Sequence, residues 1–164
     1  MSEKLGVAIV GCGFMGRRHM LGFNALHKAG KLNGEIVALL DINAETANKL
    51  AEETFSLMGV RPTVYTSIDD LLKDDRVQAL DIVTDPRTHH TIAIKAMEAG
   101  RHVLCEKPFS VNASEAKAMA NAAAENNLLL MEAMWTRYLP HIQRVRELMH
   151  ELGEIHNVQA DHGQ

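Results

Sequence analysis

The sequence predicts a doubly wound α/β fold, in which helices cover both faces of a parallel sheet. Apolar runs of strand length alternate along the chain with segments of helical periodicity, a pattern typical of repeated βαβ units. Some runs, such as residues 128–131, are apolar throughout, which indicates a strand buried on both faces. A glycine-rich turn at residues 11–16 joins the first run to the first helical segment. These three observations favour a parallel sheet with helices on both sides.

The elements follow one another in a regular order. Strands are expected at 6–10, 35–40, 63–65, 79–84, 102–105 and 128–131, and helices at 14–29, 44–54, 67–73, 89–99, 112–126 and 140–151. The first strand runs into the glycine turn, and the second ends in a carboxylate, Asp41. Gly100 follows the fourth helix as a C-terminal cap residue. Asn112, with Glu115 three residues later, is typical of a capped helix start.

The last segment, residues 155–162, alternates in the manner of a half-buried strand. A lone terminal strand cannot satisfy its backbone or bury its apolar face without a partner. We therefore expect residues 1–153 to form one domain and residues 154–164 to begin the first strand of a missing sheet.

Composition narrows the class of protein. The chain has 164 residues, enough for one domain with a substantial core, and a net charge of −4, which offers no general attraction to nucleic acid or an anionic membrane. No apolar run is long enough to span a bilayer, and residues 1–4 lead into the first strand without a signal-peptide pattern. We expect a cytoplasmic protein that binds neither nucleic acid nor membrane.

The cysteines and histidines do not form a recognised metal motif. Cys12 and Cys105 lie far apart in the sequence and are interpreted as reduced packing residues. The nine histidines are scattered, and the pair at 89–90 has no third ligand at a recognised spacing. We expect no metal site.

The glycine turn carries the strongest functional signal. Residues 11–16 read GxGxxG, in which Gly11 permits the tight turn, Gly13 lets backbone N–H groups approach a diphosphate, and Gly16 lets helix and strand pack closely. The helix that starts near Phe14 offers unpaired N–H groups to the phosphates. The turn therefore predicts a Rossmann dinucleotide-binding site, with Phe14 and Met15 among its cofactor-binding residues.

Asp41 predicts which dinucleotide is bound. A carboxylate after the second strand can accept hydrogen bonds from the adenosine ribose hydroxyls, and it repels a 2′-phosphate by like charge. This favours NAD over NADP. The alternative is that Asp41 only caps the helix that begins near Ala44.

Lys107 is the candidate catalytic residue. It follows a core strand at the carboxyl edge of the sheet, where doubly wound folds bind ligands. An ammonium there can hydrogen-bond a substrate hydroxyl or carbonyl and share in the proton movement that accompanies hydride transfer. Glu106 could pair with Lys107 and orient it, and a cis bond to Pro108 is allowed. The alternative is a surface lysine in a strand-to-helix turn.

With these motifs in view, the chain resembles the Gfo/Idh/MocA family of NAD(P)-dependent oxidoreductases. The resemblance covers nearly the whole chain. It rests on the glycine turn followed by His19, on Thr84 with His89, on the run AGRHVLCEKP at residues 99–108, and on RYLP at residues 137–140. The third of these is the most specific.

The resemblance implies roles for individual residues. It implies that Lys107 lies beside the nicotinamide, that Thr84 and His89 lie near the nicotinamide half of the site, and that Glu106 touches the cofactor ribose. Residues 132–140 resemble the branch that contains dihydrodiol and xylose dehydrogenases, which implies that Trp135 and Arg137 border the active site. A core anchor is the alternative for Trp135.

The chain departs from the family pattern in two places. NADP-using members of that branch carry Ser then Arg after the second strand, whereas this chain has Asp41 then Ile42, which removes the guanidinium that would pair with a 2′-phosphate. Asp85 and Pro86 replace the usual Pro-Asn after Thr84, so the loop beside the nicotinamide is expected to differ in shape.

The resemblance also implies a second α/β domain, beginning near Glu154, that supplies much of the substrate pocket and the usual homo-oligomer interface. We expect the chain to be the NAD-binding half of a dehydrogenase acting on a sugar, polyol or diol hydroxyl, and to be inactive when isolated, because half a cleft cannot hold the substrate in place. The alternative is a non-catalytic NAD-binding regulatory or subunit module.

Overall fold

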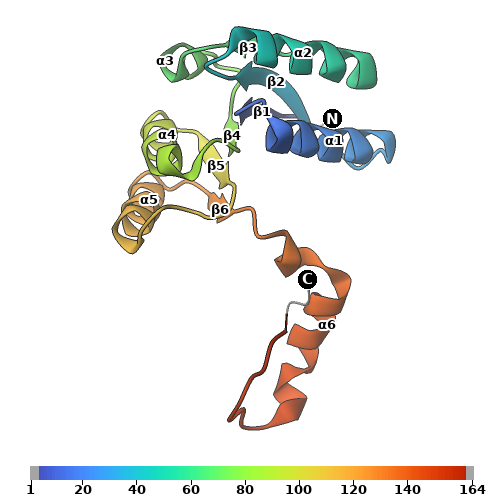
Figure 1. The fold of residues 1–164 in the computed structure, drawn as a ribbon, viewed down its shortest axis with the longest axis vertical. Helices are drawn as coiled ribbons and strands as arrows, with labels where there is room; N and C mark the ends of the chain where they lie inside the picture. The colour runs from blue at the N-terminus through green and yellow to red at the C-terminus, as the bar shows by residue number, and fades with distance from the viewer. Residues whose placement is uncertain (1–3, 162–164) are drawn as a thin grey trace. The chain divides into compact units, whose positions relative to one another are not determined.

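The computed structural model describes residues 4–161, which contain a six-stranded parallel sheet with helices on both faces (Figure 1). The strand order is β3-β2-β1-β4-β5-β6. The elements are β1 (Leu5–Val10), α1 (Phe14–Lys28), β2 (Gly34–Leu40), α2 (Ala44–Met58), β3 (Thr63–Tyr65), α3 (Ile68–Leu71), β4 (Ala79–Ile82), α4 (Pro86–Glu98), β5 (His102–Cys105), α5 (Ala113–Glu125), β6 (Leu130–Glu132), η1 (Trp135–Tyr138), α6 (Pro140–Leu148) and η2 (Met149–Leu152). The predicted doubly wound fold is confirmed.

The core lies on the two faces of this sheet. Successive side chains of a strand point to opposite faces, so Ile9 of β1 packs with residues of α1 and α2, whereas Ala8 and Val10 pack with residues of α4 and α5. All three are fully buried. Burial on both faces explains why the central strands read as continuous apolar runs, and it holds the carboxyl ends of β1 and β4 in fixed positions.

Helix starts agree with the polar residues that precede them. The side chain of Asn43 accepts hydrogen bonds from the backbone N–H groups of Glu45 and Thr46, so Asn43 caps α2. The capping interpretation of Asp41 is therefore wrong. Asn112 caps α5 by accepting from the N–H of Glu115 at 2.9 Å, as predicted.

Several boundaries differ from the expected ones. α4 begins at Pro86, three residues early, because Asp85 caps it and proline is well suited to the first helical position. α2 continues to Met58 and ends at Gly59, whose φ is 80°. β6 begins at Leu130 because the N–H of Leu128 still bonds to the carbonyl of Ala123 at the end of α5.

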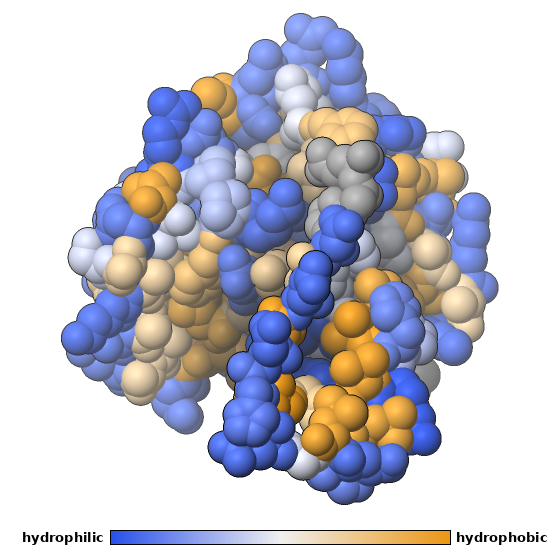
Figure 2. Space-filling view, turned by 60° about the horizontal axis from the view of Figure 1, so that its bottom comes forward, coloured by the Kyte–Doolittle hydropathy of each residue, from blue (hydrophilic) through white to orange (hydrophobic). Residues whose placement is uncertain are grey.

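The chain divides into two compact units, the first ending at Ala133 and the second beginning at Met134. The second unit contains η1, α6 and η2, and hydrophobic side chains gather along it (Figure 2). The expected strand at 155–162 is wrong for residues 155–161, which form no strand, and His162 lies outside the described residues. A strand forms only where another strand pairs with it, and none pairs with this segment within the described chain. The domain boundary at residue 153 stays a prediction.

None of the helices between residues 4 and 161 combines the length and the apolar character that crossing a membrane requires.

Candidate functional site

A cleft of about 370 Å³ opens at the carboxyl ends of β1, β2 and β4. The chain leaves β1 toward β2 on one side and leaves β4 toward β5 on the other, so the strand order reverses between β1 and β4. Doubly wound sheets bind ligands at this reversal. The residues that line the cleft include Gly11, Gly13, Asp41, Ile42, Thr84, Asp85 and Thr88.

The three glycines of the turn meet different surroundings. A Cβ on Gly11 would lie 2.8 Å from the carbonyl oxygen of Val83, and the φ of Gly11 is 102°, which other residues rarely adopt. A Cβ on Gly16 would lie 2.0 Å from the carbonyl oxygen of Gly11. A Cβ on Gly13 would meet no atom within 4 Å. Gly11 and Gly16 are thus required by the fold itself, while Gly13 borders open space.

That space suits a dinucleotide diphosphate. α1 starts at Phe14 directly after Gly13, and no side chain caps its first turn, so its first N–H groups are available to an anion. The residues of the turn therefore fit the group that the sequence motif implies.

Asp41 is held at the edge of the cleft by two backbone donors. Its carboxylate accepts from the N–H of Cys12 at 2.8 Å and from the N–H of Asn43 at 2.9 Å. Each carboxylate oxygen keeps a second lone pair for a ligand hydroxyl. The next residue, Ile42, is 92 % exposed and also lines the cleft. The glycine turn and Asp41 therefore form one rigid arrangement.

Phe14 lies on the other side of the turn. With Cys12, Gly13 and Arg17 it lines a second hollow of about 240 Å³, between α1 and α2. Its exposed ring stacks with the guanidinium of Arg18, 5.9 Å from the ring centroid. Met15 is half-buried and lines neither hollow. Cofactor contacts by these two side chains stay predictions.

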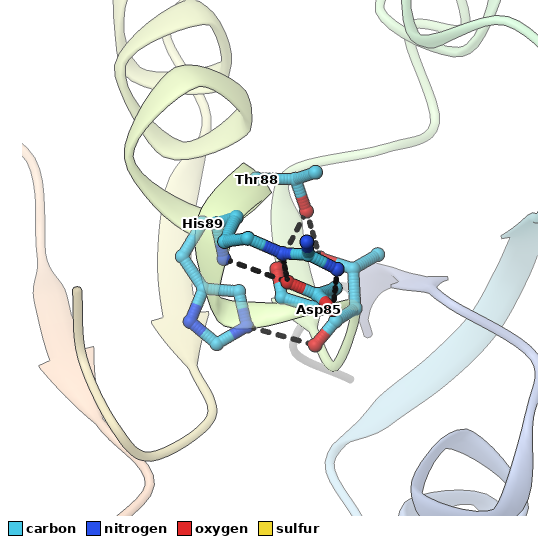
Figure 3. A network of polar contacts seen from close by, with 5 residues as sticks. Asp85, Thr88 and His89 are labelled. Carbon is cyan, nitrogen blue, oxygen red and sulfur yellow. Dashed lines mark hydrogen bonds and ion pairs between the residues drawn. The ribbon is translucent and has the colours of Figure 1, made fainter. Parts of the chain in front are cut away.

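The loop after β4 is ordered by a polar network (Figure 3). The hydroxyls of Thr84 and Thr88 lie 2.8 Å apart, and Asp85 accepts from the N–H of Arg87 at 3.0 Å. Arg87 also binds the Asp85 carboxylate through its guanidinium, which holds the pKa of that carboxyl well below its usual range. Thr84 and Asp85 both line the cleft. Asp85, which stands where the family usually has proline, therefore forms part of the cleft wall.

His89 contacts the loops rather than the cleft. Its side chain is 0 % exposed, and its two ring nitrogens lie 3.0 Å from the carbonyl oxygen of Thr84 and 3.1 Å from that of Pro108. Because α4 begins at Pro86, position 89 falls on the inner face of its first turn. His89 therefore joins the loops that follow β4 and β5, and its role in cofactor binding stays a prediction.

Lys107 is exposed just beyond the carboxyl end of β5, and its peptide bond to Pro108 is cis. Glu106 is only 7 % exposed, and its carboxylate accepts from the backbone N–H of Lys107 instead of facing the cleft. Among the described residues no ion pair engages the Lys107 ammonium, so the expected Glu106–Lys107 pair is not formed. The implied contact of Glu106 with the cofactor ribose stays a prediction.

A buried charged cluster explains the inward turn of Glu106. Nδ1 of His19 lies 2.8 Å from the carboxylate of Asp81, and Nε2 lies 3.9 Å from that of Glu106. The hydrogen bond to Asp81 raises the pKa of His19 above its ordinary value. Sequence reasoning missed Asp81, although an aspartate inside the apolar strand Ala79–Ile82 is a signal that could have found it.

Two predicted site residues lie in the second unit, and the two cysteines are buried in the first. Trp135 and Arg137 belong to η1 in the second unit, where both are exposed, and their cofactor contacts stay predictions. Cys12 and Cys105 are free and buried, and burial raises the pKa of each thiol to about 12. Between residues 4 and 161 no group of three or more potential ligands is placed to hold a metal ion.

Comparison with known proteins identifies the family. Residues 5–134 match the model of the Gfo/Idh/MocA oxidoreductases, described as an oxidoreductase family with an NAD-binding Rossmann fold. The chain belongs to the Gfo/Idh/MocA family. The match spans the glycine turn, Asp41 and Lys107, so the cleft is part of the NAD-binding Rossmann domain of an oxidoreductase. The predicted family is confirmed.

Curated relatives in this family act on diols and sugars. The chain is 38 % identical over 104 residues to trans-1,2-dihydrobenzene-1,2-diol dehydrogenase of Sus scrofa, covering 62 % of this chain and 31 % of that protein. It is 34 % identical over 141 residues to D-xylose 1-dehydrogenase (NADP(+)) of Hypocrea jecorina, covering 84 % of this chain and 35 % of that protein. The chain thus spans about a third of the length of these relatives.

Solved structures of the family have the same fold. An oxidoreductase domain protein from Kribbella flavida superposes with a TM-score of 0.78 at 33 % identity, covering 90 % of this chain and 40 % of that one. GenD2 from gentamicin A biosynthesis, solved in complex with NAD, superposes with a TM-score of 0.75 at 33 % identity, covering 90 % of this chain and 39 % of that one.

Proposed function

We propose that this domain binds NAD and supplies the cofactor half of a dehydrogenase that oxidises a hydroxyl of a sugar, polyol or diol. The observation that carries the proposal is the open space at Gly13, bordered by the N-terminus of α1 and by a fixed Asp41. The dehydrogenase relatives and the NAD complex of GenD2 support the same reaction class.

The residues of the cleft and those that follow the neighbouring strand β5 have separate proposed roles. The first N–H groups of α1 bind the diphosphate, and Asp41 accepts from the adenosine ribose hydroxyls. Bound NAD supplies a hydride acceptor. The Lys107 side chain hydrogen-bonds the substrate oxygen: its amine form takes the hydroxyl proton as the alcohol becomes a carbonyl, and its ammonium form returns that proton in the reverse reaction. His89 holds the two loops that border this region.

We propose NAD as the preferred cofactor. The Asp41 carboxylate would face a 2′-phosphate with like charge, and Ile42 offers it no hydrogen-bond donor. The xylose dehydrogenase relative uses NADP, whereas GenD2 was solved with NAD, so relatives alone do not decide the choice. Three further expectations stay predictions: that the protein is a homo-oligomer, that it is cytoplasmic, and that it has a second domain.

Filling the open space tests NAD binding directly. Gly13→Val places a side chain where no protein atom lies, at a φ of −74° that valine tolerates. We expect calorimetric titration to show at least about tenfold weaker NAD binding, because the diphosphate is held away from the α1 N-terminus, with the melting temperature unchanged. Gly22→Ala, on the exposed face of α1, is the control. Equal affinity in both variants would place the dinucleotide elsewhere.

Turnover tests the catalytic role of Lys107. Lys107→Ala is compared with the wild type in whichever form of the protein turns over NAD with polyol or sugar substrates. We expect kcat to fall at least about a hundredfold, as is usual for loss of a group that moves a proton. An unchanged kcat removes Lys107 from the mechanism. NAD binding without turnover in any form of the protein supports the regulatory or subunit module instead.

A further inference from the structure

The buried cluster of Asp81, His19 and Glu106 joins three elements beneath the candidate catalytic residue. His19 lies on α1, Asp81 on β4, and Glu106 directly after β5. The exposed fractions of Asp81 and Glu106 are 1 % and 7 %. Neither carboxylate serves the nucleotide cleft, whose lining includes neither residue. The two buried acids therefore have a role other than lining the nucleotide cleft.

Charge explains how the cluster is held together. A buried carboxylate is costly unless it is paired and hydrogen-bonded. Because a carboxylate only accepts, Nδ1 of His19 must donate to Asp81, at 2.8 and 3.0 Å from its two oxygens. The other ring nitrogen faces Glu106 at 3.9 Å. One imidazole ring thus lies between two buried acids.

The far end of the cluster reaches the backbone of Lys107. One carboxylate oxygen of Glu106 lies toward His19, and the other accepts from the N–H of Lys107. The N–H of Glu106 bonds to the carbonyl oxygen of Ile82 at 2.8 Å, which fixes this residue to β4. With its carboxylate turned inward, Glu106 makes no ion pair with the Lys107 ammonium, and neither does any other acid between residues 4 and 161.

We propose that His19 is a positioning residue, which holds the Glu106 carboxylate inward and so fixes the backbone at Lys107 while keeping its ammonium available to a ligand. The proposal rests on the proposed function, because it assigns the cluster a purpose through Lys107. If the imidazolium is lost, Glu106 loses its buried partner, and the residue next to it in the chain, Lys107, carries an exposed cation.

The charge on His19 depends on pH. The charged groups that act on its ring are Asp81 from β4 and Glu106 from the end of β5. The hydrogen bond to Asp81 raises its pKa above 6.5, burial opposes this, and Coulombic attraction to both acids adds to it. The imidazolium therefore persists above pH 6.5 and is lost as the pH rises through the folded-state value.

The test is NMR of the ¹⁵N-labelled 164-residue chain without NAD, titrated upward from about pH 5.5, above the ordinary range of glutamate. In the wild type we expect the Lys107 amide signal to move with the same midpoint as the His19 ring nitrogens. His19→Gln should abolish that movement and speed hydrogen exchange of the Lys107 amide about tenfold, as for loss of a hydrogen bond to a charged group. His27 is exposed on the same helix, and His27→Gln should change neither the pH-dependent movement of the Lys107 amide signal nor its rate of hydrogen exchange.

A Lys107 amide that stays still through the His19 titration overturns the proposal, and so does a His19→Gln variant that behaves as the His27→Gln control does. The wild-type titration needs no variant, so a folding defect in His19→Gln leaves the test intact. The NMR experiment contains no NAD, so its result does not depend on NAD binding. A chain that fails to bind NAD in the calorimetric titration therefore refutes the proposed function and leaves the proposal about His19 to be decided by NMR.

Discussion

At the scale of the residue, the glycines of one motif have different physical roles. Gly16 is required because a Cβ would run into the carbonyl of Gly11, whereas Gly13 is required only if a ligand occupies the space beside it. The same division holds for the acids. Asp41 faces the cleft and is oriented by backbone donors, while Glu106 is turned into the protein by His19. A motif therefore combines residues that serve the fold with residues that serve the ligand.

Gly16→Ala should damage the turn itself. Its Cβ would lie 2.0 Å from a backbone carbonyl oxygen that cannot move without shifting β1, so we expect a loss of about 2 kcal/mol or more in the free energy of unfolding, together with weaker NAD binding. Urea denaturation measures the first quantity. Gly22→Ala meets no atom within 4 Å and should instead add about 0.5–1 kcal/mol, since alanine favours a helix. Similar stabilities of the two variants would contradict this account.

Cofactor preference should follow residues 41 and 42. Asp41→Ser with Ile42→Arg removes the repelling carboxylate and adds a guanidinium that can pair with a 2′-phosphate, so the ratio of NADP to NAD affinity should rise at least about tenfold. Nucleotide fluorescence titrations measure both affinities. Asp41→Ser alone serves as the intermediate control. A wild type that prefers NADP, or a double variant with no shift, contradicts the placement of the ribose at Asp41.

At the scale of the element, caps decide where the helices begin and so where the loops of the site lie. Asp85 and Pro86 start α4 three residues earlier than its periodicity indicates, and this early start places His89 under the loop instead of in the cleft. Asn43 caps α2, which leaves the Asp41 carboxylate free for the turn and a ligand. Local capping thus controls which side chains reach the site.

Asn112→Ala should destabilise α5 without affecting the cleft. The side chain of Asn112 accepts from the N–H of Glu115 and from the hydroxyl of Ser114, and loss of such a cap costs about 1 kcal/mol in the free energy of unfolding. Thermal denaturation measures the change. Asn121→Ala, exposed within the same helix and not a cap, should leave stability unchanged or slightly higher. Unchanged NAD affinity in both variants is also expected.

At the scale of the whole molecule, the sheet order assembles the site. Gly11, Asp41, Thr84 and Lys107 are far apart in the sequence, and each follows a different strand. Parallel strands end at the same edge, so all four come to one side of the sheet. The second unit adds another property, because hydrophobic side chains remain exposed along it (Figure 2). Val145 is 55 % exposed and Leu152 is 66 % exposed.

Such exposed apolar surface predicts self-association of the chain. We expect light scattering to show a mass that rises with concentration, and Val145→Glu with Leu152→Glu to lower it toward the monomer by adding charge to that surface. Val111→Glu, at a similarly exposed valine of the first unit, should have little effect. A monodisperse monomer of the wild type at high concentration would falsify this expectation.

The sequence alone determined the order of strands and helices, the glycine turn, the position of Asp41 and the family, because these depend on local periodicity and on motifs of contiguous residues. The tertiary structure decided the directions of the buried polar side chains. His89 and Glu106 turned inward, Asp81 emerged as the partner of His19, and residues 155–161 formed no strand. Each of these depends on groups brought close from distant parts of the chain, where burial makes an unpaired charge or backbone group costly, and no local pattern records such partners.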